Sequence, residues 1–353
     1  MKKILLLILI FFLSECLIFS EELKEILKKE GLEFGIQLSP SKQILEEERE
    51  KYFEAEILQY IFLESPAYRV ACNSNFCAFA QKEGKISIYD LKNKKIIYQE
   101  NISRYPLYNV AFHPFKNIIC CADREGKITI FDLDKKEKLH TIYELGKRLS
   151  EVKFSPDGKY LAVAYLDSGQ INVYNLSKYQ NISTIKAHTE GIYYLAFSPE
   201  GRLIASASRD RKIGITPIDH AWPSQLLTEH LFFVLTLDFS PDNEFFASGG
   251  GDGKLIVWKK NQNVIDKNIY FEWIHPNWVT TVKFFRDYII TSCRDGKIRI
   301  FDFMNKKLLG IFKCSESIFS IDITPQSEFL FVSTLKGVAQ YNLKEIIEKT
   351  LNY

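Results

Sequence analysis

The sequence predicts an all-β protein, a seven-bladed β-propeller of four-stranded antiparallel blades with a short N-terminal helical extension. Three observations predict this fold: a repeat of about 42 residues, tight turns at fixed places in the repeat, and strands rich in aromatic and β-branched residues. A fixed period of about 20 to 50 residues indicates a repeat architecture. The 27 Phe and 18 Tyr, against two Met, favour a pleated, half-buried surface over helix.

The repeat can be read from two signals that stay in phase from residue 68 onward. The first is a phrase containing Phe-Ser-Pro or a variant of it, as in Val152–Gly158 and Leu195–Gly201. The second is a tight-turn position, which recurs every 41 to 43 residues at Gly84, Gly126, Gly169, Arg211, Gly253, Gly296 and Gly337. Seven units in phase predict seven copies of one structural element.

Each unit predicts four antiparallel strands. Pro-Asp-Gly or its equivalent joins the first two strands, because Pro fixes φ and Gly accepts positive φ. A second turn, such as Arg294–Gly296, leads into the alternating strand Ile298–Phe301, and a third hairpin leads into Lys307–Phe312. Radial repetition of such blades hides the sheet edges, whereas one open sheet would exceed the roughly ten strands that twist allows.

The last blade needs an outer strand from elsewhere, because residues 344–353 read as a short amphipathic helix. Alternating apolar residues precede the first repeat, so we expect 52–63 to be the outer strand of blade seven and 52–343 to form the propeller. Residues 21–51 read as a helical extension, with Ser39 and Pro40 as cap and first helical residue. Two interpretations of this extension stay open: a solvated helix packed on the propeller, or a dedicated docking segment.

The first twenty residues read as a signal peptide. Two lysines precede the apolar stretch Ile4–Leu13, and cleavage is expected after Ser20. Leu13–Cys16 also resembles a bacterial lipoprotein signal, in which Cys16 would carry a lipid anchor. An uncleaved anchor is a further alternative, although Ser14 and Glu15 interrupt the stretch before the roughly 20 apolar residues that a span needs. We therefore expect an exported protein, periplasmic or envelope-associated in a bacterium, without a membrane span after processing.

The cysteine positions bear on the redox compartment, and the net charge bears on the class of partner. Cys72 and Cys77 flank one turn closely enough for a disulfide in an oxidising compartment. Cys77, Cys120 and Cys121 lie in apolar strands, where free cysteines behave as small hydrophobic residues. The net charge of +2 provides no field that would steer the chain to nucleic acid.

The repeats resemble the WD-repeat family (WD40-like) over roughly Tyr52 to Asn342. Blades of that family end their third strand with Trp-Asp; the endings here are Tyr89-Asp90, Phe131-Asp132, Tyr174-Asn175, Thr216-Pro217, Trp258-Lys259, Phe301-Asp302 and Tyr341-Asn342. Only repeat five carries the family's complete hydrogen-bonded set, as His230, Ser248, Asp252 and Trp258. The resemblance implies closure by an N-terminal strand, and partner docking on the face formed by the loops that join strand four to strand one and strand two to strand three.

The sequence shows no pattern for catalysis. It has no Gly-x-Ser-x-Gly elbow, no phosphate-binding loop and no zinc spacing. His188, His230 and His275 recur at one repeat position, which indicates hydrogen-bonded support of the blades. Residues 249–253 align with the turns of other blades and are read as a turn. We predict no catalytic residue, no metal and no cofactor.

The predicted docking face collects aromatic residues and arginines, the types enriched at interface hot spots. The candidate partner-binding residues are Tyr193, Phe232, Phe233, Trp278, Arg209, Arg211 and Arg294. We expect a monomeric, non-catalytic scaffold that binds a protein partner there. Two alternatives are a hydrolase or lactonase acting in the central channel, which would need carboxylates or histidines converging on the axis, and a structural factor for envelope assembly.

Overall fold

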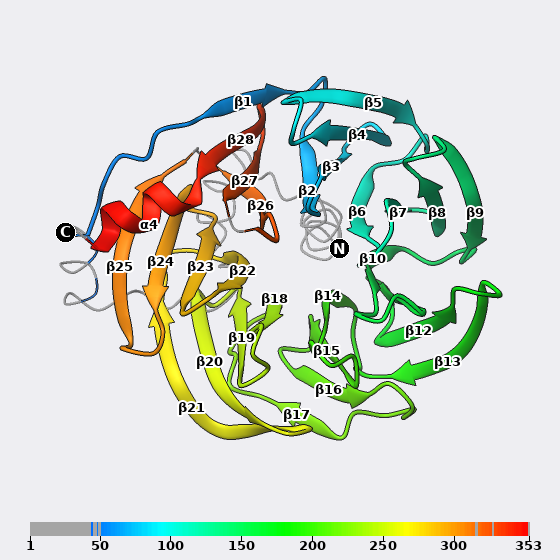
Figure 1. Cartoon of the computed structure of the whole chain (residues 1–353). Coiled ribbons are helices and arrows are strands. Elements are labelled where there is room, and N and C mark those ends of the chain that lie inside the picture. The colour runs from blue at the N-terminus through cyan, green and yellow to red at the C-terminus, as the bar shows by residue number, and fades with distance from the viewer. Residues whose placement is uncertain (1–43, 45–47, 49–50, 315–316, 327, 352–353) are drawn as a thin grey trace, which may run out of the picture. The chain divides into compact units, whose positions relative to one another are not determined.

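The computed structural model describes Ile44, Glu48 and residues 51–314, 317–326 and 328–351. It confirms the predicted seven-bladed propeller: the strands form seven sheets of four antiparallel strands each. Figure 1 shows these sheets arranged in turn around a centre. We name the strands of each blade a to d, from the inner strand outward, and the a strands of adjacent blades contact one another.

The first three blades follow the predicted register closely. Blade one comprises β2 (Ala67–Cys72), β3 (Phe76–Gln81), β4 (Lys85–Asp90) and β5 (Lys95–Asn101). Blade two comprises β6 (Leu107–Phe112), β7 (Ile118–Asp123), β8 (Lys127–Asp132) and β9 (Glu137–Tyr143). Blade three comprises β10 (Leu149–Phe154), β11 (Tyr160–Tyr165), β12 (Gln170–Asn175) and β13 (Gln180–Lys186).

The later blades vary more in the length of strand d. Blade four comprises β14 (Ile192–Phe197), β15 (Leu203–Ser208), β16 (Ile213–Pro217) and β17 (Gln225–Leu227). Blade five comprises β18 (Val234–Phe239), β19 (Phe245–Gly250), β20 (Lys254–Asn261) and β21 (Val264–Ile274). Blade six comprises β22 (Val279–Phe285), β23 (Tyr288–Cys293), β24 (Lys297–Asp302) and β25 (Lys307–Lys313). Blade seven comprises β26 (Ile318–Ile323), β27 (Phe329–Thr334), β28 (Gly337–Asn342) and, as its outer strand, β1 (Gln59–Phe62).

Strand β1 closes the ring, but it is shorter than the expected 52–63. It pairs with β28 from Gln59 opposite Gln340 to Phe62 opposite Gly337. Residues 51–53 instead lie along strand d of blade six, where the Phe53 amide donates to the Ile311 carbonyl at 2.8 Å. The expectation that Tyr52 and Phe53 belong to blade seven was therefore wrong, whereas the Leu58 amide already donates to the Gln340 carbonyl of β28 at 2.9 Å. The physical reason is burial of the Phe53 ring, which packs 5.5 Å from that of Phe312.

Helix α4 (Leu343–Leu351) follows β28 directly and is the helix that the structure describes in full. It buries Leu343, Ile346 and Ile347 in the core shared by blades six and seven. Of the predicted N-terminal extension, 21–51, all but Ile44, Glu48 and Lys51 lies outside the described residues, as do the predicted signal peptide and Cys16. Within the described part of the chain, no helix is long and apolar enough to span a membrane.

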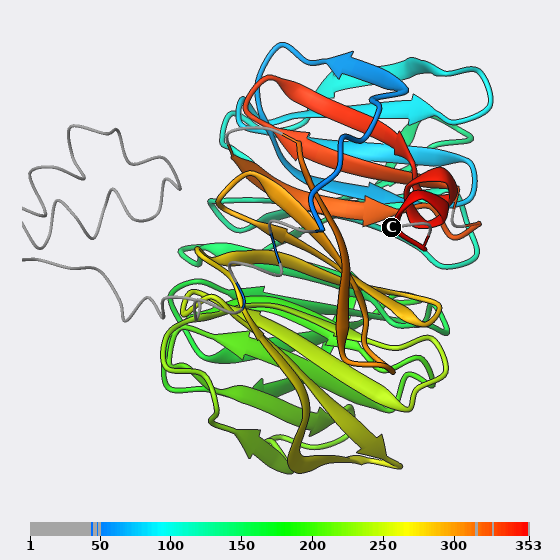
Figure 2. The same ribbon diagram turned by 90° about the vertical axis from the view of Figure 1, so that its left-hand side faces the viewer.

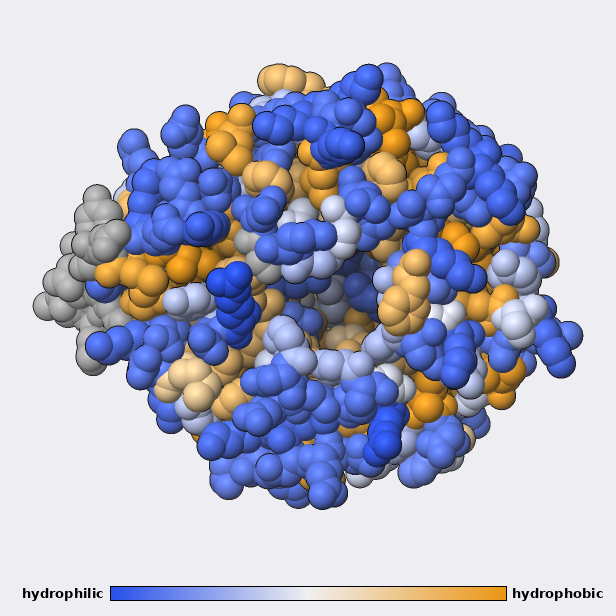
Figure 3. Space-filling model, in the orientation of Figure 1, coloured by the Kyte–Doolittle hydropathy of each residue, from blue (hydrophilic) through white to orange (hydrophobic). Residues whose placement is uncertain are grey.

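The two faces of the ring carry different loops. Helix α4 begins where a strand c ends, so it lies on the face that carries the a–b and c–d turns. This face is turned toward the viewer in Figure 1 and lies on the right in the edge-on view of Figure 2. Figure 3 shows this face as largely hydrophilic and hollowed at its centre. The d–a loops and b–c turns lie on the opposite face.

The disulfide that the spacing permits is present: Cys72 and Cys77 are bonded across the first hairpin of blade one, where they face each other in the strand register, so the interpretation of Cys77 as a free cysteine was wrong. Cys120 and Cys121 are buried in strand b of blade two, and burial raises the pKa of both thiols. They are small core residues, as expected.

Candidate functional site

Four aromatic residues from blades four to six adjoin one another on the face of the d–a loops, and we call them the aromatic ladder: Tyr193, Phe232, Phe233 and Trp278. The rings of Tyr193 and Phe233 are 5.8 Å apart, and Phe232 stacks on Phe233 at 4.0 Å. Phe232 continues the series to Trp278 at 6.2 Å. All four side chains are half-buried, so each ring is fixed on one side and open on the other.

Two of the three predicted arginines lie over rings of the ladder. The Arg209 guanidinium lies 5.6 Å from the centre of the Phe233 ring, and that of Arg294 lies 4.9 Å from the centre of Trp278. Arg209 also pairs with Glu190 at 3.4 Å. Burial lowers the pKa of Arg294. Arg211 is not brought to the ladder: it is exposed, occupies the left-handed turn position at φ 70°, and makes no ring contact among the described residues.

The glycine-rich turn of blade five explains how the ladder and the blade pack so closely. A Cβ on Gly251 would lie 2.6 Å from Cδ1 of Phe232, and a Cβ on Gly250 would lie 2.5 Å from Nδ1 of His230 and Oδ1 of Asp252. The absence of side chains at these two positions leaves room for both the aromatic ring and the buried polar set beneath it. The turn therefore serves packing, in agreement with its reading as a blade turn.

The structural hydrogen-bond set of blade five is a triad rather than the expected set of four. His230 Nδ1 lies 3.1 Å from the Asp252 carboxylate, and His230 Nε2 lies 2.7 Å from the Ser248 hydroxyl. Burial raises the pKa of Asp252, but hydrogen bonds from His230 and the backbone outweigh it, so the pKa is lowered overall. Trp258 is fully buried and stacks on Phe246, but its indole nitrogen makes no hydrogen bond to any described residue.

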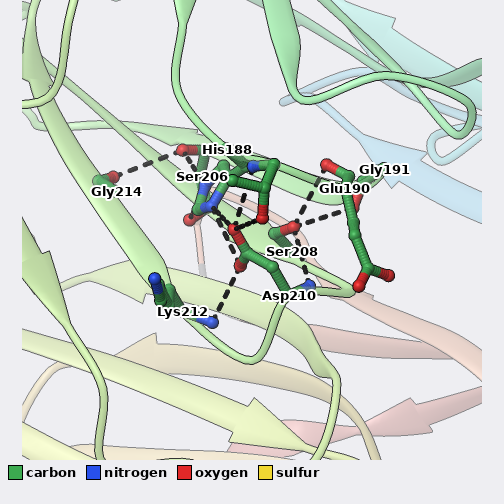
Figure 4. A network of polar contacts seen from close by, with 9 residues as sticks. His188, Glu190, Gly191, Ser206, Ser208, Asp210, Lys212 and Gly214 are labelled. Atoms are coloured by element: carbon green, nitrogen blue, oxygen red, sulfur yellow. Dashed lines mark hydrogen bonds and ion pairs between the residues drawn. The ribbon is translucent and has the colours of Figure 1, made fainter.

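Blade four carries the same triad, as Figure 4 shows. His188 Nδ1 lies 3.1 Å from Asp210, and its Nε2 lies 2.8 Å from the Ser206 hydroxyl. Burial raises the pKa of Asp210, but the hydrogen bond from His188 has the opposite effect and outweighs it, so that the pKa is lowered to about 2. Sequence reasoning passed over this set because Thr216 stands where blade five has Trp258. The signal that identifies it is the shared spacing of 18 and 22 residues from the histidine.

Blade six uses the same positions differently. His275 is bonded to the Gly253 carbonyl at 3.1 Å and to the Thr291 hydroxyl at 2.9 Å. Asp295, the counterpart of Asp252, instead binds Arg299 Nη2 at 2.7 Å. Arg299 is fully buried, and its Nε and Nη2 donate to the Glu48 carboxylate at 2.6 and 3.1 Å. We call Glu48, Asp295 and Arg299 the blade-six ion triad.

The inner strands bring carboxylates and cations together in the central channel. The Arg69 guanidinium lies 2.6 Å from Glu151, which also pairs with Lys153 at 3.4 Å. Both cations lie 5.0 Å from the centre of the Tyr194 ring, which belongs to another blade.

A second charged group lies in the channel on blades five to seven. Lys283 pairs with Asp322 at 2.8 Å. Burial raises the pKa of nearby Asp238 to about 6, although Lys283 opposes the change. The channel alternative required converging carboxylates, and these exist, but each one already faces a cation of the protein. Among the described residues, no group of three or more His, Cys, Asp or Glu side chains is placed to hold a metal ion.

Comparison with known families gives two matches. The family described as "WD domain, G-beta repeat" matches residues 179–215, 222–259 and 271–302. Each match covers all or part of strand d of one blade and of strands a to c of the next, so together they reach the inner three strands of the blades that carry the ladder. The family described as "Eukaryotic translation initiation factor eIF2A" matches residues 73–166.

Three curated proteins illustrate the similarity. The intraflagellar transport protein osm-1 of Caenorhabditis elegans is 31% identical over 97 residues, 27% of this chain and 6% of that protein. Jouberin of Mus musculus is 36% identical over 78 residues, 21% and 7% of the two chains. Cleavage stimulation factor subunit 50 of Arabidopsis thaliana is 31% identical over 124 residues, 31% and 29% of the two chains. The similarity thus spans less than a third of each relative.

Proposed function

We propose that this seven-bladed propeller of WD40 repeats is an exported scaffold that binds a protein partner through the aromatic ladder. WD40 propellers are generally non-catalytic scaffolds and commonly bind protein partners. The observation that carries the proposal is the continuity of the ladder: four half-buried rings from three consecutive blades, with arginines over Phe233 and Trp278.

The packing of the ladder suits it for binding. Phe232 rests on Gly251, so its ring is held by the backbone of a rigid turn. Little side-chain entropy is then lost on association, which favours affinity. The arginines keep hydrogen-bond donors beside an apolar surface, and this combination of planar cation and aromatic ring is typical of hot spots. Leu231, 43% exposed and adjacent in the chain, extends the apolar area.

Export is supported by the signal-like sequence at residues 1–20 and by the Cys72–Cys77 disulfide. Disulfides persist in oxidising compartments and are rare in the cytosol. The export arm is tested by alkylating the protein in intact cells before lysis. We expect Cys72 and Cys77 to resist alkylation until a reductant is added, and the protein to fractionate outside the cytoplasm. Reduced Cys72 and Cys77 in a cytoplasmic fraction would contradict export but would not bear on partner binding by the ladder.

The ladder is tested by cross-linking in native extracts, followed by measurement of the affinity of the captured partner for purified variants. Trp278→Ala and Arg294→Ala should each weaken binding at least tenfold, because truncation of a hot spot costs about 2 kcal/mol or more. The matched control is Trp222→Ala, since Trp222 is 59% exposed, its ring centre lies 5.4 Å from Nζ of Lys186, and it shares no ring contact with the ladder among the described residues. Equal affinity of Trp278→Ala and Trp222→Ala would exclude the ladder as the binding site.

A further inference from the structure

A cavity of about 310 Å³ lies between blades two and three, on the face opposite the aromatic ladder. Its floor is apolar, formed by Ile118, Ile130, Phe154 and Leu176. Its volume is at the lower end of the range for ligand pockets, roughly 300 to 1,000 Å³. The cavity is therefore large enough for a group of the size of one amino-acid residue.

Two residue changes in blade two account for the cavity, and the first is at the start of strand b. Strand b begins with an aromatic residue in five blades, at Phe76, Tyr160, Phe245, Tyr288 and Phe329. In blade two this position is Ile118, and the smaller side chain leaves unfilled space beside Phe154. No other blade combines a small residue here with the second change described next.

The second change is His113, which stands where four other blades have Ser or Thr before the a–b turn, at Ser155, Ser198, Ser240 and Thr324. In those blades the hydroxyl accepts a hydrogen bond from the first residue of strand b, as Ser155 does from the Tyr160 amide at 3.0 Å. His113 instead reaches blade three, where its Nε2 lies 3.2 Å from the Gly158 carbonyl. A Cβ on Gly158 would lie 2.6 Å from this ring, so the close approach depends on glycine. His113 thus forms a wall of the cavity that joins the two blades.

The ring of His113 contributes no charge to this wall. Burial, and to a smaller extent the nearby Lys116, lower its pKa, so it is neutral near pH 7. Its Nδ1 accepts a hydrogen bond from the Phe115 amide at 3.1 Å, which leaves the proton on Nε2, facing the Gly158 carbonyl.

The rim is positively charged. Lys116 and Lys159 stand on the a–b turns of blades two and three, on either side of the cavity, and both are exposed. None of the described residues that line the cavity is acidic; Asp157, beside them, pairs with Lys159 at 3.5 Å, so two lysines stand against one carboxylate. Phe115, which precedes Lys116, is 74% exposed, and its ring lies 6.3 Å from that of the wall residue His113. The cavity therefore combines an apolar floor with two cations at its mouth and an aromatic side chain available to cover an occupant.

We propose that this cavity binds the C-terminal residue of a partner chain, with an apolar side chain on the floor and the terminal carboxylate between Lys116 and Lys159. Charge complementarity selects the anionic end, and the apolar floor selects the side chain. Capture of a C-terminal carboxylate is an established mode of peptide recognition. The site is separate from the aromatic ladder and does not depend on the function proposed for it.

The test uses the purified full chain and a fluorescent peptide, Gly-Ser-Gly-Gly-Phe, labelled at its N-terminus and prepared as the free acid and as the C-terminal amide. Fluorescence anisotropy should show binding of the acid, at least tenfold weaker binding of the amide, and weakening of the acid alone by 0.5 M NaCl. Lys116→Gln and Lys159→Gln should reduce binding of the acid severalfold. Lys307→Gln, an exposed lysine on blade six, is the control and should leave it unchanged.

The decisive variant is Ile118→Phe, which introduces the type of side chain that five other blades carry at this position and so should fold with an unchanged or higher melting temperature. It should abolish binding of the acid. Equal binding of acid and amide, or full binding by folded Ile118→Phe, would overturn the proposal. Binding of decanoate without binding of the peptide would also overturn it, in favour of a free fatty acid. A negative result here leaves the Trp278→Ala experiment on the ladder unaffected.

Discussion

Blades five and six carry an aspartate at the same place in the turn between strands b and c, but the two carboxylates bind different partners. Asp252 binds His230, so the set is completed within one blade and the loop that enters it. Asp295 binds Arg299, which in turn binds Glu48, 251 residues earlier in the chain. The same turn can therefore close a blade locally or fix a distant segment onto it.

The difference originates at one position of strand c. Arg299 lies three residues after the tight-turn position of its blade, where blades one to five have small or uncharged side chains: Ser87, Thr129, Asn172, Gly214 and Ile256. A buried guanidinium requires anionic partners, because an isolated buried charge is strongly unfavourable. Asp295 supplies one partner and Glu48 the other, which leaves His275 to bond with Gly253 and Thr291. Glu48 thereby fixes at least one point of the N-terminal extension to blade six, in agreement with the interpretation that the extension packs on the propeller.

The largest effect is expected from Arg299→Met, which keeps the volume but leaves Glu48 and Asp295 buried without their cation. Breaking a buried ion set in this way costs about 3 to 5 kcal/mol of unfolding free energy. Urea denaturation at pH 7 measures the loss. The double variant Glu48→Gln/Arg299→Met should recover part of it, since one stranded charge is gone. A loss below about 1 kcal/mol in the single variant would mean that solvent reaches the triad.

A smaller effect is expected from Asp252→Ala, which leaves His230 without its carboxylate. The loss should be about 1 to 3 kcal/mol, the cost of an unsatisfied buried polar group. Asp210→Ala in blade four is the matched case and should lose a similar amount, because its triad has the same geometry. Neither variant should change partner affinity. Unaltered stability combined with lost binding would show that these triads serve recognition instead.

The sequence predicts the buried polar contacts of blade five but not those of blade six. The His230 triad and the ring of blades follow from residues that recur in phase, so their spacing alone places them together. The Glu48–Arg299 contact has no periodic signal, because each partner occurs once and 251 residues separate them. The same reason explains the error at residues 52 and 53: alternation predicts a strand, but only the packed structure shows that Phe53 is buried against blade six.

The aromatic ladder could be predicted from the sequence in part. The repeat register places Tyr193, Phe232 and Trp278 at the same edge of consecutive blades, and the structure brings their rings together. The register does not give side-chain direction, however, and Arg211 shares the turn of Arg209 without reaching a ring. A turn residue at φ 70° directs its side chain by the backbone, which residue type alone does not reveal.

The pH dependence should have opposite signs in the channel and in the turns. Asp238 has a native pKa of about 6, above the ordinary value of 3.8, so the native state binds more protons than the unfolded state between these values. Its contribution to stability therefore falls as pH rises from about 4 to 6. Asp238→Asn should gain stability relative to the unmodified protein over this range, because its amide oxygen can still accept from the Phe284 amide.

The contrast is Asp210, whose native pKa of about 2 lies below 3.8. Its contribution is present above about pH 4 and is lost as pH falls toward 2. Asp210→Asn should therefore be less stable than the unmodified protein at pH 7 and approach it in acid. Urea midpoints at pH 3, 4.5 and 7 measure both variants. Curves for Asp238→Asn that stay parallel to those of the unmodified protein would show that Lys283 and Lys153 keep Asp238 ionised throughout.

The smallest effect on stability is expected from Trp278→Ala, although this variant should lose the most in binding. Trp278 is half-buried, and its contacts are to Phe232 and the Arg294 guanidinium, both at the edge of the blade. Loss of such edge contacts should cost about 1 kcal/mol or less, well below the effect of Arg299→Met in the same blade. Thermal unfolding followed by near-ultraviolet circular dichroism would measure it. A loss comparable to that of Arg299→Met would show that Trp278 belongs to the core of blade six, and the ladder would then be a packing feature rather than a binding surface.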